Sequence, residues 1–325
     1  MSGTNYCGLA ALGLVALALS GPLAAQPYPN KPMRMIVPYA AGGVTDMLGR
    51  LAAEHIKNKT GQSVVVENRP GAGGNTGVAA VVTSPADGYT LGLVAVSNLN
   101  MNQFLYKSMP YDPIKDVVPI AAIGDAPQIM VINAKVPASD LKAFIAWARA
   151  NPDKANYGSA GTGSTVHLAA DQITRQAGMK VTHVSYRGAG PAVADLVGGN
   201  VQMMVVAAAL VVEHAKAGTL RILASASAKR LPFLPDVPTT AEAGLPVYET
   251  ANWFGLIAPK GTPAEIVDKL NGIVLSMATD ADIKRRFDAN YILPMPLSSA
   301  QFAKMVADDI PKWERIIKEA GITPE

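Results

Sequence analysis

Cysteine is almost absent from this chain of 325 residues, and Cys7 lies close to the start. An apolar run over residues 7–19 precedes Leu-Ala-Ala at residues 23–25, which is the pattern of a secretory signal peptide. We therefore predict that residues 1–25 are removed on export and that the mature protein begins at Gln26. From Gln26 onward the sequence has no cysteine, which excludes disulfides and thiolate chemistry.

Charge is also scarce. Charged residues make up 16% of the sequence, the formal net charge is +3, and no basic block occurs, so we expect no nucleic-acid partner. The apolar run of the signal peptide is too short to span a bilayer, and no later run is long enough. Hydrophobic residues reach 49%, which supplies a sizeable core. We predict a soluble, monomeric, exported α/β protein of the periplasm.

The patterns of catalytic and cofactor sites are incomplete. The glycine loop at residues 71–74 resembles a dinucleotide fingerprint, but Thr76 stands where the third glycine belongs, and no P-loop lysine follows. Ser159 and Ser164 lack the flanking glycines of a nucleophile elbow. The histidines are scattered, without the spacing of a metal site. We expect no cofactor, no metal and no catalytic residue, although His167 leaves open a hydrolase that pairs it with a serine.

The stretch at residues 33–54 predicts an anion site. Residues 35–37 are typical of a short buried strand, which Pro38 ends, and residues 40–43 are small enough for a tight loop. Apolar residues at helical spacing then predict a helix, with Thr45 or the glycine turn as N-cap and Asp46 near its positive end. A helix start after such a loop binds anions through the backbone. An ordinary strand-to-helix turn is the alternative.

Similar loops recur at the ends of later predicted strands. They lie at residues 97–98, 158–165 and 187–189, and the second of them again opens a helix. The chain divides into one α/β unit up to about residue 124 and another from about 125 to 251, with the segment from 259 packing back on the first. Alternating strands and helices predict parallel sheets covered on both faces. Loops at strand ends of both units would then face one cleft.

Seven segments resemble one known family, namely PYAAGGVTDMLGR, ENRPGAGGNTG, SPADGYTL, YGSAGTGSTVHLAA, YRGAGPAVADLVGG, LPDVPTTAEAG and WFGLIAPKGTP. They resemble the Bug receptors, the periplasmic solute-binding proteins of tripartite tricarboxylate transporters. The resemblance runs in order along nearly the whole mature chain. It implies a type II periplasmic-binding-protein fold of two α/β lobes with a ligand cleft between them. Lobe 1 would comprise residues 26–124 with 252–325, and lobe 2 residues 125–251.

The resemblance also implies a function and a site. Such a receptor captures a small carboxylate and delivers it to a membrane permease of one large and one small subunit. In the family, main-chain groups and waters of two loops hold the carboxylate, and these loops correspond to residues 39–45 and 159–165. We predict the following ligand-binding residues: Tyr39, Ala41, Gly42, Gly43, Val44, Thr45, Ser97, Asn98, Ser159, Thr162, Gly163, Ser164, Thr165, His167, Arg187, Ala207 and Trp253.

Three of these predictions are specific. Gly43 is where we expect the backbone to approach the ligand, with a φ angle open to positive values. Arg187 would add positive potential to the cleft and contact a distal carboxylate, or else form a surface salt bridge. His167 would lie in a helix near the interface between the lobes. A sensor subunit that signals to a membrane kinase is the alternative to a transport receptor, and the identity of the carboxylate stays open, because Ala40-Ala41 replaces the family's usual proline.

Overall fold

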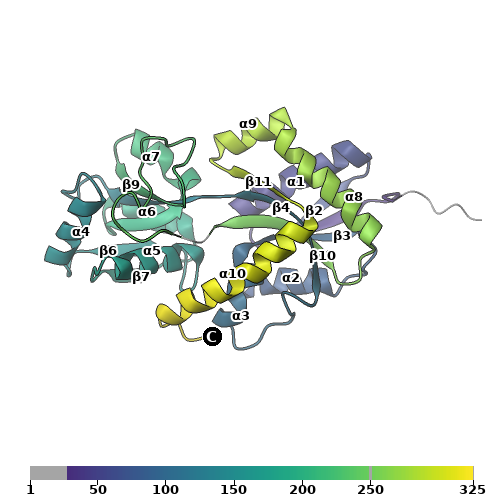
Figure 1. Cartoon of the computed structure of the whole chain (residues 1–325), viewed down its shortest axis with the longest axis horizontal. Coiled ribbons are helices and arrows are strands. Elements are labelled where there is room, and N and C mark those ends of the chain that lie inside the picture. Colours follow the sequence, from purple (N-terminus) through teal and green to yellow (C-terminus); the bar gives the residue numbers. More distant parts are fainter. Residues whose placement is uncertain (1–27, 249–250, 325) are drawn as a thin grey trace, which may run out of the picture.

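Two α/β lobes lie side by side in the computed structural model, which describes residues 28–248 and 251–324 (Figure 1). The signal peptide predicted at residues 1–25, and the start of the mature chain at Gln26, lie outside the described residues. Within the described ranges, no helix combines the length and the apolar character needed to cross a membrane.

The sheet of lobe 1 has six strands in the order β11-β4-β10-β3-β1-β2. They are β1 Met33–Val37, β2 Val64–Asn68, β3 Thr90–Ala95, β4 Val117–Asp125, β10 Trp253–Pro259 and β11 Leu293–Leu297. Strands β2 and β3 pair with β1 in parallel, whereas β10 is antiparallel to both of its neighbours and β11 is antiparallel to β4. The expectation of a parallel sheet is therefore confirmed for β1, β2 and β3 and wrong for β10 and β11; β10 returns from lobe 2 and runs opposite to the strands on either side of it.

Lobe 2 repeats this mixture. Its strands are β5 Gln128–Asn133, β6 Asn156–Ser159, β7 Thr182–Ser185, β8 Met203–Ala207 and β9 Leu220–Ala226, in the order β7-β6-β8-β5-β9. Strands β7 and β8 pair with β6 in parallel, and β5, which enters from lobe 1, is antiparallel to β8 and β9. In each lobe the strand that enters from the other lobe, β10 or β5, therefore runs opposite to both of its neighbours.

Helices cover both faces of each sheet (Figure 1). Lobe 1 carries α1 Val44–Thr60, α2 Asn75–Val82, α3 Asn102–Leu105, α8 Ala264–Leu275, α9 Ala281–Ala289 and α10 Ser299–Glu319. Lobe 2 carries α4 Leu141–Ala150, α5 Thr165–Gln176, α6 Ala189–Gly198 and α7 Val212–Lys216. Short helical turns are η1 Ala72–Gly74, η2 Ser97–Met101, η3 Ala208–Leu210 and η4 Ser276–Thr279. The apolar stripe predicted on α1 is confirmed, since Leu48, Leu51, Ala52 and Ile56 are buried.

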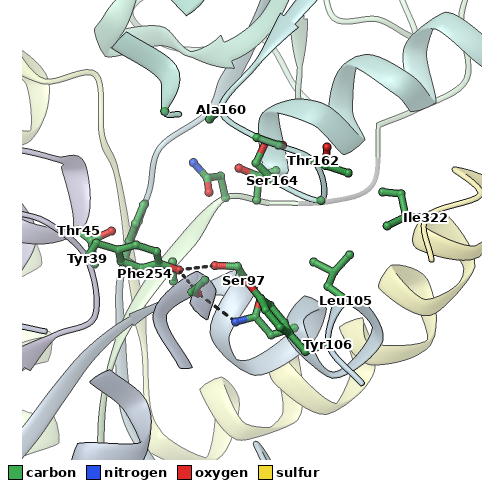
Figure 2. Close-up of a pocket in the computed structure, with 18 of the residues that line it drawn as sticks. Tyr39, Thr45, Ser97, Leu105, Tyr106, Ala160, Thr162, Ser164, Phe254 and Ile322 are labelled. Carbon is green, nitrogen blue, oxygen red and sulfur yellow. Dashed lines mark hydrogen bonds between the residues drawn. The ribbon is translucent and has the colours of Figure 1, made fainter. Parts of the chain in front are cut away.

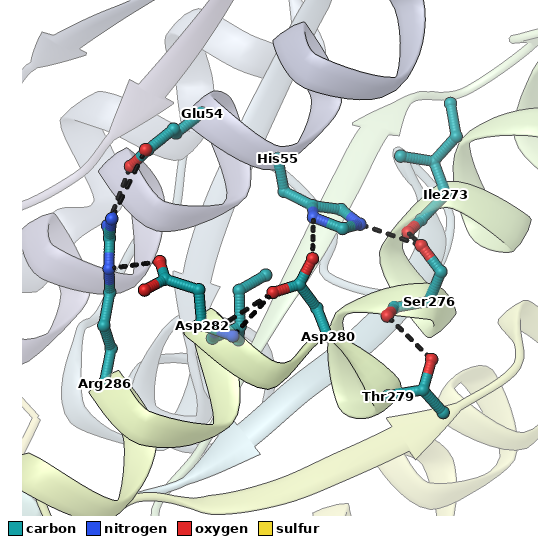
Figure 3. Close-up of polar contacts among 9 residues, drawn as sticks. Glu54, His55, Ile273, Ser276, Thr279, Asp280, Asp282 and Arg286 are labelled. Atoms are coloured by element: carbon teal, nitrogen blue, oxygen red, sulfur yellow. Dashed lines mark hydrogen bonds and ion pairs between the residues drawn. The ribbon is translucent and has the colours of Figure 1, made fainter.

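Polar contacts fix the far end of α1 to the C-terminal helices (Figure 3). Burial lowers the pKa of His55, whose ring is hydrogen-bonded to Ser276 Oγ at 2.8 Å and lies 3.9 Å from the Asp280 carboxylate. Glu54 pairs with Arg286 at 2.8 Å across the same interface. The helix that opens at the cleft is thus anchored to its own lobe at the opposite end.

The two lobes meet through the crossing segments and through α10. The Asn252 N–H donates to Asp125 Oδ1 at 2.8 Å, where the chain passes between the sheets. Helix α10 belongs to lobe 1 but packs against α5 of lobe 2 (Figure 1), and Arg175 lies 3.3 Å from Glu319. On the other side, Tyr291 of lobe 1 donates to Glu213 of lobe 2 at 2.7 Å. These contacts hold the lobes together around the space between them.

Candidate functional site

A cavity of about 460 Å³ lies between the two lobes (Figure 2). Lobe 1 contributes Tyr39, Thr45, Ser97 and Phe254 to its wall, and lobe 2 contributes residues 160–165. Of the described residues that line it, none is Asp, Glu, Lys, Arg or His. Hydroxyls, the side-chain amides of Asn102 and Asn252, main-chain groups and apolar side chains therefore make up the wall.

The first loop brings the start of α1 to this cavity. Gly43 is the N-cap of α1, in an extended conformation, and no side chain caps the first turn. The first N–H groups of a helix have no partner within the helix, so they remain free to bind an anion. The expectation of a positive φ at Gly43 is wrong, because its φ is −85° and Gly42 carries the positive value of 89°. The residue of the turn with a positive φ is thus Gly42, one position earlier than predicted.

Asp46 stabilises this loop through hydrogen bonds to its carboxylate. Its carboxylate accepts hydrogen bonds from the Gly42 N–H at 3.0 Å, from Arg50 at 3.0 Å and from Asn68 at 2.9 Å. Burial alone would raise the pKa of Asp46, but these hydrogen bonds outweigh burial and hold the pKa below its usual value. Asp46 therefore stays ionised, but it is paired with Arg50 and does not line the cavity.

The floor of lobe 1 is a polar cluster around the Gly73 carbonyl. That oxygen accepts from Tyr39 Oη at 3.2 Å, Asn98 Nδ2 at 3.1 Å and Asn102 Nδ2 at 3.0 Å. Tyr39 Oη also lies 2.7 Å from Ser97 Oγ, and burial raises the tyrosine's pKa, which keeps it protonated. The Gly73 carbonyl thus holds the side chain of Tyr39, which follows β1, and the side chains of Asn98 and Asn102, which follow β3.

Sequence reasoning did not select Gly73, Asn102 or Tyr106, although all three line the cavity. Gly73 has a φ of 61°, and an added Cβ would lie 2.6 Å from Tyr106 Oη, so a side chain does not fit there. Two features of the sequence could have pointed to these residues. One is the repeated asparagine in Asn-Leu-Asn-Met-Asn after β3, and the other is the separate glycine loop at residues 71–74, which fits no dinucleotide fingerprint. Buried asparagines need partners, and main-chain carbonyls of such a loop supply them.

The loop of lobe 2 brings the start of α5 to the opposite wall. Ser164 is the N-cap of α5, accepts the His167 N–H at 3.2 Å and donates to the Gly161 carbonyl at 2.6 Å. The Gly163 N–H donates to His167 Nδ1 at 3.0 Å, so this nitrogen is an unprotonated acceptor. Burial, and next the proximity of His183, lower the pKa of His167 to about 4. A neutral imidazole therefore supports the loop from within the lobe.

His167 belongs to a stack of rings in which His167 and Tyr157 are buried and His183 is half-buried. Its ring lies 4.0 Å from that of His183, which in turn lies 4.9 Å from the Tyr157 ring. His183 Nε2 is 2.7 Å from Ser159 Oγ, but Ser159 has no exposed surface. This serine–histidine pair cannot reach a substrate, and the arrangement therefore favours support of the loop over hydrolysis.

The predicted site residues fall into two groups. Those that line the cavity are Tyr39, Thr45, Ser97, Thr162, Gly163, Ser164 and Thr165. The others lie outside its lining: Ala41, Gly42, Gly43 and Arg187 are exposed, Val44 is half-buried, and Asn98, Ser159, His167, Ala207 and Trp253 are buried. Ligand contact stays a prediction for all of them. Asn98, Ser159 and His167 support residues that do line it.

Comparison with known proteins agrees with this architecture. Residues 48–322 match the family described as "Tripartite tricarboxylate transporter family receptor". Protein BugT of Bordetella pertussis is 35% identical over 322 residues, which cover 99% of each chain. The solved structure of R. palustris Rpa4515 with adipate has a TM-score of 0.84 and 35% identity, covering 92% of this chain and 100% of that one. MatC from Rhodopseudomonas palustris with bound malate has a TM-score of 0.78 and 31% identity, covering 89% and 100%.

These relatives have the periplasmic-binding-protein fold, and the family consists of solute-binding receptors rather than enzymes. The alternative of a secreted hydrolase is set aside on that ground. The chain belongs to the Bug family of tripartite tricarboxylate transporter receptors.

Proposed function

We propose that this protein is a monomeric periplasmic receptor that captures a small organic carboxylate and delivers it to a permease of one large and one small membrane subunit. The observation that carries the proposal is a cavity without charged lining onto which two helix starts open, α1 from one lobe and α5 from the other. Adipate and malate in the two related structures support a carboxylate as the ligand class.

In this proposal, main-chain N–H groups at the two helix starts bind the carboxylate of the ligand. The N-terminal end of a helix carries a partial positive charge. A hydrogen bond to a charged group contributes about 1.5–3 kcal/mol. A carboxylate between α1 and α5 would contact both lobes, and it would therefore stabilise their closed arrangement by its preference for that state. In this proposal residues 26–124 with 252–325 move as lobe 1 and residues 125–251 as lobe 2.

Titration calorimetry of the chain from Gln26 onward tests the capture step. The panel comprises mono-, di- and tricarboxylates, each paired with its amide, which has a similar shape but no charge. At least one carboxylate is expected to bind at least ten times more tightly than its amide. Equal binding of acid and amide across the panel would show that no anion site exists.

Uptake measurements test the delivery step. Cells that lack this chain are expected to lose uptake of the labelled carboxylate that bound in the titration, and expression of the full chain should restore it. Unchanged uptake without the chain would contradict delivery to a permease, while the capture step would still stand on the calorimetry.

A further inference from the structure

The two sides of the cavity differ in chemistry (Figure 2). Tyr39 and Thr45 lie on one side, near the start of α1, and Thr162 and Ser164 of the lobe 2 loop lie toward the other side, above Leu105 (Figure 2). On the opposite side Leu105 and Ile322 face the same space, and Tyr106 lies next to Leu105 (Figure 2). Leu105 and Ile322 therefore add hydrocarbon to that side of the wall, beside the hydroxyls of the lobe 2 loop and of Thr323.

Ile322 reaches the cavity because α10 spans both lobes. The helix ends at Glu319, Gly321 turns the chain with a φ of 66°, and Ile322 follows. Trp313 and Ile316 of α10 are buried in one apolar cluster with Leu168 of α5, and Ile322 packs against that cluster. The C-terminal segment is thus seated between the lobes, and Ile322 forms a fixed part of the cavity wall.

Leu105 closes the same side against lobe 2. A Cβ added to Gly163 would lie 3.0 Å from Leu105 Cδ2, so the leucine packs directly on the main chain of the lobe 2 loop. Two cationic residues adjoin lining residues in the sequence, Arg187 beside Gly188 and Lys107 beside Tyr106, but both are exposed and neither lines the cavity. A second carboxylate beside Leu105 and Ile322 would lose water without gaining an ionic partner, and such burial is unfavourable.

We propose that the ligand is a monocarboxylate whose far end is an apolar chain or ring, and that Leu105 and Ile322 select it. This proposal rests on the proposed function and narrows its substrate class. It makes the C-terminal segment a specificity determinant, since hydrocarbon of the ligand is removed from water against Ile322.

Hexanoate and adipate test it, because both have six carbons and only adipate carries a second carboxylate. In calorimetry the chain from Gln26 onward should bind hexanoate at least ten times more tightly than adipate. Ile322→Lys places a cation at the far end and should shift the ratio of the two affinities at least tenfold toward adipate. Ile322→Leu should keep the original ratio.

Ile114→Lys is the matched control, because Ile114 is 49% exposed outside the cavity lining and the change in net charge is the same. It should leave the ratio unchanged, and circular dichroism verifies that each variant is folded. Adipate binding as tightly as hexanoate would overturn the inference but leave carboxylate capture intact. An unchanged ratio in Ile322→Lys would overturn the role of Ile322. Binding of no carboxylate in the wider panel would overturn the proposed function and this inference together.

Discussion

The two loops that face each other across the cavity are supported in different ways. The loop before α1 is held by the Asp46 carboxylate, which accepts the Gly42 N–H, pairs with Arg50 and accepts a hydrogen bond from Asn68. The loop before α5 is held by the Ser164 hydroxyl and by the buried ring of His167. An aspartate with a lowered pKa keeps its charge across the neutral range, whereas an imidazole that must remain neutral is sensitive to acid. Lobe 2 is therefore the half of the cleft that responds to pH.

The largest expected effect comes from acid acting on His167. Its pKa is lowered from 6.5 to about 4, so between these values the unfolded chain binds a proton that the folded chain does not. The free energy of unfolding should then fall with pH, at about 1.4 kcal/mol per unit, and reach a loss of about 2 kcal/mol at pH 5 from this group. Above pH 6.5 both states are neutral and the group has no effect.

Urea unfolding at pH 7 and pH 5 measures this loss. His167→Asn keeps an acceptor near the Gly163 N–H but does not titrate, so it should lose about 2 kcal/mol less than the unchanged chain over that interval. Asp125 acts in the opposite direction, since burial raises its pKa to about 6, but it is present in both proteins and cancels. His214→Asn, at an exposed position, is the control. Equal losses in all three proteins would show that His167 is not kept neutral.

The next effect comes from glycines of the two loops. Gly163 has a φ of 76°, and its added Cβ would lie 3.0 Å from Leu105 Cδ2, whereas Gly43 has a φ of −85° and its added Cβ would meet nothing within 4 Å. Left-handed backbone costs an L-residue about 1–2 kcal/mol. Gly163→Ala should therefore lower carboxylate affinity at least tenfold, or about 1.4 kcal/mol, in calorimetry.

Gly43→Ala is the matched substitution in lobe 1 and should change affinity less than about twofold, or 0.4 kcal/mol. The reverse order of the two effects would mean that the backbone of the first loop makes the closer approach to the ligand, as the sequence suggested. Circular dichroism separates an effect on binding from loss of the fold.

Local signals in the sequence predicted the first strand and the helix that follows it. Apolar spacing identified α1, Gly61 ends it with a φ of 74°, and Asp140 begins α4 as its N-cap. These features depend on a few neighbouring residues. The direction of β10 was missed, because it depends on where the chain returns from lobe 2. The edge strand β11 was also missed, since its two prolines are tolerated only where one side lacks a partner strand.

Part of the candidate site was also predictable from local sequence, and part depends on the fold. The loop segments at residues 39–45 and 159–165 could be found from small residues before a helix, and part of each lines the cavity. Ile322 could not be found in this way, because it lines the same cavity as Leu105 although the two are more than 200 positions apart, and no local pattern encodes that arrangement. The loops that we propose to hold an anion could thus be found in the sequence, whereas the place of Leu105 and Ile322 in the wall required the fold.

The smallest expected effect concerns Arg187, which the sequence placed at the cleft. It follows β7 and is exposed, while the adjacent Gly188, with a φ of 121°, takes the place at the cavity wall. An exposed charge near the cavity acts on a ligand only through water and salt, which screen it over about 10 Å at 0.1 M. Arg187→Ala should therefore weaken hexanoate and adipate equally and by less than about twofold, or 0.4 kcal/mol.

Calorimetry at low and at moderate salt measures this effect, and the small loss should shrink as salt is added. Arg285→Ala removes the same charge from α9, at a side chain that is 73% exposed, and serves as the control. A tenfold loss for adipate alone would place the Arg187 guanidinium against a distal carboxylate. That result would overturn the apolar far end of the cavity, because the wall at Leu105 and Ile322 would then lie within reach of a cation.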